Sequence, residues 1–98
     1  MAAKLRRVVL DVLKPHDPSI VELSQRLAEL EGVDGVNINI YEVDRKVENA
    51  KITVEGSDLN FEILVAIIED AGGTTHSIDE AVAGHEMIAP SPTLQDNG

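Results

Sequence analysis

The stretch VNINIYEVDRKVENAKITVE, residues 36–55, decides the fold. Apolar and polar side chains alternate on both sides of Asp44-Arg45-Lys46, which is the pattern of two strands, 35–43 and 47–55, joined by a hairpin tip. The side chains predicted to face a core are Val36, Ile38, Ile40, Ala50, Ile52 and Val54. Those predicted to face the other way are Asn37, Asn39, Tyr41, Lys51, Thr53 and Glu55.

Four further elements surround this hairpin. Residues 5–13 alternate in the same way and form a strand, with Arg7, Val9, Asp11 and Leu13 on its outward side. Asp17-Pro18 is a helix start, because the carboxylate can cap free N–H groups, and the helix that follows runs to residue 31. A second helix over 61–71 is capped by Asn60 or by Asp58, and TTHSIDEAVA, residues 74–83, is the last strand.

The order strand–helix–strand–strand–helix–strand predicts an α+β, ferredoxin-like βαββαβ sandwich. Its four-stranded antiparallel sheet has the order 4-1-3-2, and both helices cover one face. We expect residues 1–84 to form this single domain and residues 85–98 to form a C-terminal arm or tail, mobile from residue 90 onward. The other sheet face is left open.

The second helix is unusually apolar, since eight of the eleven residues in Phe61–Ala71 are hydrophobic. Such a helix is covered on more than one side. It is either a thickly hydrophobic core helix or a helix that packs against another subunit, and we favour the second interpretation. The sequence therefore predicts a homo-oligomer.

Composition excludes several classes of function. The chain has 98 residues, no Cys and a net charge of −10, which exclude thiol chemistry and disfavour nucleic acid and anionic membranes as partners. Asp11 interrupts the first apolar stretch, so we expect a cytoplasmic protein without a signal peptide. Basic residues gather at the N-terminus, where they face either acidic neighbours in the sheet or the acidic surface of another copy.

The richest polar constellation combines Asp11 with His76, Ser77, Asp79 and Glu80. Antiparallel pairing places the start of the last strand beside the end of the first. A histidine with several carboxylates can hold Ca²⁺, Mg²⁺, Mn²⁺ or Zn²⁺; the alternative is a solvated edge strand. A one-residue choice of register decides whether His76 or Ser77 shares the face of Asp11.

A second acidic cluster, Glu42, Asp44 and Glu48, surrounds the hairpin tip. It is either a solvated turn or a site for an ion that bridges subunits. His16 and His85 stand apart from both clusters, and we expect them to be isolated and solvated.

Three stretches, LRRVVLDVLKPHDPSI, EGVDGVNINIYEVDR and HSIDEAVAG, resemble the archaeal family called domain of unknown function 211. The resemblance covers residues 4–84 and leaves the tail outside. It implies a cytoplasmic protein with a ferredoxin-like fold that forms homo-oligomers, rings among them, and it implies no activity. The family pattern has an apolar pair where this chain has Thr74-Thr75.

Two functions follow. The first is a non-enzymatic homo-oligomeric module that binds a small ligand or a divalent metal ion. Its candidate ligand-binding residues are Asp11, Asn37, Asn39, His76, Ser77 and Asp79. The alternative is a small metal-assisted enzyme that uses Asp11, His76 and Asp79, which requires a concave site with a displaced pKa.

Overall fold

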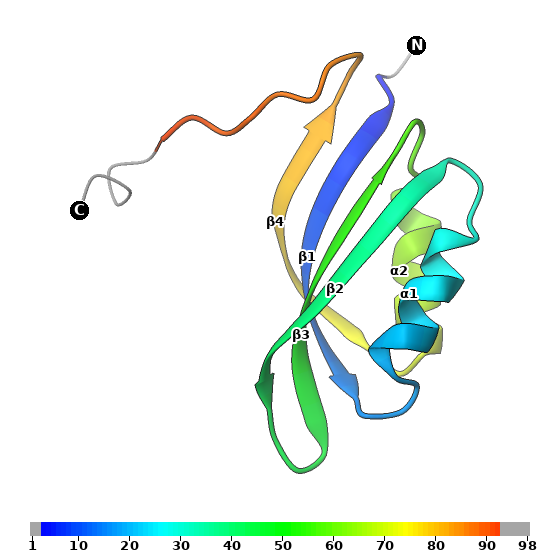
Figure 1. The fold of residues 1–98 in the computed structure, drawn as a ribbon, viewed down its shortest axis with the longest axis vertical. Coiled ribbons are helices and arrows are strands. Elements are labelled where there is room, and N and C mark those ends of the chain that lie inside the picture. The colour runs from blue at the N-terminus through cyan, green and yellow to red at the C-terminus, as the bar shows by residue number, and fades with distance from the viewer. Residues whose placement is uncertain (1–2, 93–98) are drawn as a thin grey trace.

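The computed structural model describes residues 3–92 and has the predicted βαββαβ order (Figure 1). Its elements are β1 (Leu5–Pro15), α1 (Ile20–Ala28), β2 (Val33–Val43), β3 (Val47–Gly56), α2 (Phe61–Asp70) and β4 (Thr74–Ala83). All strand pairs are antiparallel, and the sheet order is β2-β3-β1-β4. This is the predicted order read from the other edge, so the fold prediction is confirmed.

Both helices pack on one side of the twisted sheet (Figure 1). The alternating apolar residues of β1 and β3 point to that side and are buried together with Leu23 and Leu27 of α1 and Leu64 and Ile68 of α2. Removal of this apolar surface from water is the main force that holds the layers together. Within residues 3–92 no helix lies on the opposite face of the sheet.

The helix ends agree only partly with the sequence analysis. The cap of α1 is Ser19 rather than Asp17, because the helix begins at Ile20 and Ser19 Oγ accepts from the Glu22 N–H at 3.2 Å. Asn60 is the cap of α2, and its side chain accepts from the Ile63 N–H at 3.1 Å. The first helix ends at Ala28 instead of residue 31. Gly32 then turns the chain at φ +87°, where a Cβ would overlap the Asp58 carbonyl.

The pairing of β4 with β1 settles the register that the sequence left open. Ser77 lies opposite Asp11, and the register shifts on either side leave His76 and Asp79 as extra residues. Such bulges redirect side chains at an edge strand. The Thr74-Thr75 pair is exposed at Thr74 and half-buried at Thr75, whose Oγ1 has no hydrogen-bond partner within residues 3–92.

The described part of the C-terminal arm, residues 85–92, contains no strand and runs away from the body of the protein (Figure 1). Its base is fixed by Arg6, whose guanidinium donates to the Gly84 and His85 carbonyl oxygens at 3.3 and 3.0 Å. Residues 93–98, which we expected to be mobile, lie outside the described residues. Among residues 3–92 no helix is long and apolar enough to cross a membrane.

Candidate functional site

The open face carries a polar row that crosses all four strands. Asn39 of β2 lies opposite Lys51 of β3, which lies opposite Asp11 of β1, and Asp11 lies opposite Ser77 of β4. The neighbours of these residues along β1 and β3, such as Leu10 and Ile52, are fully buried on the helix side. Strand alternation therefore turns the row toward solvent.

Tyr41 extends over this row from the edge strand β2. The pairing of β2 with β3 shifts between Ile40 and Glu42, so Tyr41 is the extra residue of a bulge. Its hydroxyl donates to the Asp11 carboxylate two strands away and accepts from Asn49 Nδ2 at 3.5 Å. The hydrogen bond to Asp11 raises the pKa of Tyr41, because a phenolate would lose that bond and face a carboxylate.

These side chains surround an open hollow of about 300 Å³, lined by Asp11, Asn39, Tyr41, Lys51 and Asp79. Asp79 is the bulge residue of β4, and one of its oxygens accepts from Ser77 Oγ at 2.7 Å. Its other oxygen lies 3.8 Å from Lys51 Nζ, which is too far for a hydrogen bond. We call this site the open-face hollow.

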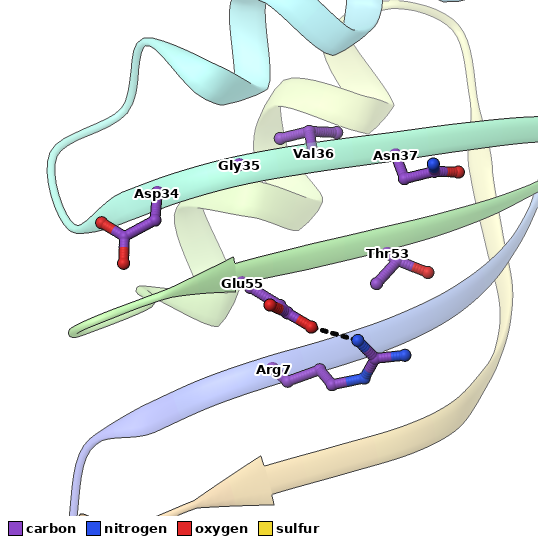
Figure 2. A pocket seen from close by; sticks show the side chains of 7 residues that line it. All are labelled: Arg7, Asp34, Gly35, Val36, Asn37, Thr53 and Glu55. Carbon is purple, nitrogen blue, oxygen red and sulfur yellow. Dashed lines mark hydrogen bonds and ion pairs between the residues drawn. The ribbon is translucent and has the colours of Figure 1, made fainter. Parts of the chain in front are cut away.

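A second hollow of about 500 Å³ lies further along the same face and is lined by Arg7, Asp34, Gly35, Val36, Asn37, Thr53 and Glu55 (Figure 2). The positive charge of Arg7 in this hollow is already paired. The guanidinium contacts Glu55 and, through Nε at 2.9 Å, Glu80. These hydrogen bonds, that to Glu80 first, raise the pKa of Arg7. Asn37 accepts from Asn39 Nδ2 and so connects the two hollows.

The structure brings together part of the predicted ligand set. Asp11, Asn39 and Asp79 line the open-face hollow and Ser77 supports Asp79, whereas Asn37 lines the second hollow. His76 is an exposed bulge residue and does not line either hollow. Tyr41 and Lys51 also line the hollow, although they are not in the predicted ligand set. Their outward positions, and the fact that Tyr41 is the only tyrosine, were the available signals.

The residues predicted to bind a metal ion are not brought together as a group. Within residues 3–92 no group of three or more His, Cys, Asp or Glu side chains is arranged to hold a metal ion. Glu80 pairs with Arg7 instead of joining Asp11 and Asp79.

The family model that matches this chain covers residues 6–97 and is that of domain of unknown function 211, described as "Uncharacterized ArCR". The chain belongs to this archaeal family. The match extends through the tail, so the resemblance covers more than residues 4–84. The chain is also 51% identical over 92 residues to an uncharacterized protein of Methanocaldococcus jannaschii, an alignment that covers 94% of this chain and 95% of the relative.

In this member of the family, the acidic residues at the hairpin tip are not equivalent. Glu48 accepts from Lys14 Nζ at 2.6 Å, and its second oxygen lies 3.2 Å from His16 Nδ1. The Lys14 side chain is 1% exposed, because it continues the inward alternation of Val8, Leu10 and Val12 in β1. We call Lys14, His16 and Glu48 the hairpin-end cluster.

The expectation that His16 is isolated is wrong. Its Nε2 lies 2.9 Å from the Asp44 carbonyl oxygen, so both ring nitrogens face acceptors. Only the doubly protonated imidazolium donates on both sides. The Glu48 hydrogen bond accordingly raises the pKa of His16, while the bond from Lys14, followed by that from His16, lowers the pKa of Glu48. His85, the other histidine expected to be solvated, is exposed.

Proposed function

We propose that this protein is a non-enzymatic homo-oligomeric module that binds a small ligand on its open sheet face. The observation that carries the proposal is the open-face hollow, where side chains from all four strands contribute polar groups around one aromatic ring. Binding sites commonly combine apolar walls with a few convergent polar groups. A rigid sheet holds such groups in place without a moving loop.

The chemistry of this face supports binding rather than catalysis. Ser77 donates to the carboxylate of Asp79, not to a histidine, and His76 does not line the hollow. A serine nucleophile needs a base within hydrogen-bond reach that is in turn oriented by a third group. Among the described residues, Ser77, His76 and Asp79 do not form that arrangement.

The proposed partner is a second copy of the chain. A hollow of about 220 Å³ at one end of the helix pair is lined mainly by apolar side chains, among them Leu30, Val33 and Ile63. Ile63 is 45% exposed, and the arm carries Met87 and Ile88 at 43% and 65% exposure. Because the arm leaves the body on the side of β4, away from its own helices (Figure 1), the hollow that it occupies would be that of another copy.

Light scattering tests the assembly. We expect a mass above that of one chain, which falls toward the monomer when Ile63→Glu or Ile88→Glu places a charge in the contact. Val21→Glu is the matched control, since Val21 is 63% exposed on α1 and does not line the hollow. A wild-type monomer at all concentrations would contradict the oligomer.

The same measurement with EDTA, and then with added Ca²⁺, Mg²⁺, Mn²⁺ or Zn²⁺, tests for a metal ion. Within residues 3–92 one chain supplies no set of three such ligands, so a bound ion would need ligands from a second copy. We expect the mass to be unchanged by EDTA. Dissociation in EDTA that one ion reverses would place the ion between subunits and replace the small ligand as the bound species.

A further inference from the structure

The open-face hollow presents more hydrogen-bond acceptors than donors. Tyr41 occupies one oxygen of Asp11, and Ser77 occupies one oxygen of Asp79. One of the two N–H groups of the Asn39 amide donates to Asn37, which leaves the other N–H to donate and the carbonyl oxygen to accept. The hollow thus offers a second oxygen from each carboxylate and one amide oxygen, whereas Lys51 is the one cationic donor that lines it among residues 3–92.

Lys51 does not cancel this acceptor surplus. Its ammonium group lies 3.8 Å from the Asp79 oxygen, and its side chain is 52% exposed. An exposed ion pair of this kind contributes little to stability. Lys51 can therefore leave Asp79 to another donor at small cost.

The aromatic ring adds a second property. Tyr41 lines the hollow with its ring exposed beside the carboxylates. A cation near the face of an aromatic ring is attracted by the ring quadrupole, and an alkyl chain packs against it. A donor-rich cation with an apolar chain is complementary to both the oxygens and the ring.

We infer that the ligand of the open-face hollow is a small protonated alkylamine. The inference rests on the ligand-binding part of the proposed function and names the class of ligand. An ammonium group supplies three donors to the oxygens of Asp11, Asp79 and Asn39, and the alkyl chain lies along Tyr41. The net charge of −10 draws such a cation toward the protein.

Intrinsic fluorescence tests the inference at the site itself. The chain has one tyrosine and no tryptophan, so its emission reports on Tyr41 alone. A carboxylate that accepts from a phenol quenches that phenol, and an amine that binds Asp11 changes the emission. The probe is 1,4-diaminobutane, with 1,4-butanediol and succinate as neutral and anionic probes of the same chain length, all at constant ionic strength.

We expect a saturable change in Tyr41 emission with 1,4-diaminobutane only. Asp11→Asn and Asp79→Asn each weaken the affinity by about tenfold or more, since a hydrogen bond to a charged group is lost. Glu29→Gln makes the same charge change at an exposed position after α1, outside the hollow, and leaves the affinity within about twofold because screening is strong there.

Each other outcome has a distinct meaning. An equal response to butanediol, or an equal loss of affinity in Glu29→Gln, would overturn the amine class as non-specific. A saturable response to succinate alone would overturn the amine class but leave the open face as a ligand site. No response to any probe in the wild-type protein would overturn both this inference and the proposed ligand site.

Discussion

The hairpin-end cluster and the open-face hollow differ in how many of their carboxylate oxygens have a partner within the protein. In the hairpin-end cluster, Glu48 is 13% exposed, and its two oxygens lie within 3.2 Å of Lys14 Nζ and His16 Nδ1. In the open-face hollow, Asp79 is 37% exposed and its cation, Lys51, lies 3.8 Å away. Carboxylates that are saturated inside the protein stabilise it, and those left with free oxygens are available to a ligand.

The difference follows from the two faces of β1. Lys14 has the same parity as Val8, Leu10 and Val12, so its ammonium group is carried to the covered side and must find a partner there. A buried charge without a partner is costly, and Glu48 directly opposite on β3 provides one. Asp11 has the other parity and faces water, where no partner is required.

The largest effect that tests this comparison is the removal of the Glu48 charge. Glu48→Gln leaves the buried Lys14 ammonium without a counter-ion and should lower the free energy of unfolding by about 3 kcal/mol. The matched control is Glu55→Gln, which breaks a pair with Arg7 whose side chains are 31% and 48% exposed, and should cost less than about 1 kcal/mol. Urea denaturation measures both.

Equal losses of unfolding free energy in the two variants would contradict this expectation, since burial would then not distinguish the two ion pairs. A loss confined to Glu55→Gln would reverse it.

A smaller effect is expected from pH. The folded-state pKa of His16 is raised above 6.5, so its contribution to stability is full below about pH 6.5 and is lost as the pH rises through the folded value. The folded-state pKa of Glu48 is lowered from 4.5, so its contribution is full above about pH 4.5 and is lost as the pH falls through the folded value. The cluster therefore stabilises the fold most between these two limits.

The stability of His16→Gln relative to wild type, measured from pH 5 to 9, isolates the histidine. The deficit of the variant should be largest near pH 5–6 and shrink as the pH rises. His76→Gln is the control, because His76 is exposed and belongs to neither cluster. A deficit that is independent of pH would show that the imidazolium has no special role.

The smallest effect is expected on the open face. Tyr41→Phe removes the hydroxyl that donates to Asp11, but Tyr41 is exposed and Asp11 is only half-buried, so the Asp11 carboxylate regains a hydrogen bond to water. We expect urea denaturation to show a change of less than about 1 kcal/mol in the free energy of unfolding. Titration calorimetry, which does not need the tyrosine emission that the variant lacks, should show an altered affinity for the amine probe. A loss of unfolding free energy as large as that of Glu48→Gln would show that the side chains of the open-face hollow also stabilise the fold.

Much of the fold was predictable because the alternation of apolar residues and the turn and cap residues are local signals. The boundaries of β4 and the cap at Asn60 agree with the sequence analysis, and so does the sheet order. Ser19 was missed as a cap because Asp17, with the proline that follows it, carries the same chemical signal two residues earlier. The cap is decided by where the helix axis starts, which depends on packing.

The candidate site was predictable only in part. The sequence brought Asp11 together with Asp79 by topology, but the bulges in β4 and β2 determine that Asp79 and Tyr41 join Asp11 while His76 does not. A bulge adds one residue and shifts the alternation, but residues 76–80 are mostly polar and show no clear alternation in which a shift could be recognised. Glu48 was grouped with Glu42 and Asp44 by nearness in the chain, although its partners come from β1 and the loop after it.

By itself, the sequence determined the element order, the core-facing side of β1, β2 and β3, and the family. Each of these depends on the periodicity and identity of residues that are close together in the chain. Only the tertiary structure decided which carboxylates are saturated and which are free. That property depends on register shifts and on partners far apart in the chain, such as Lys14 with Glu48 and Tyr41 with Asp11, which meet only when the strands pair.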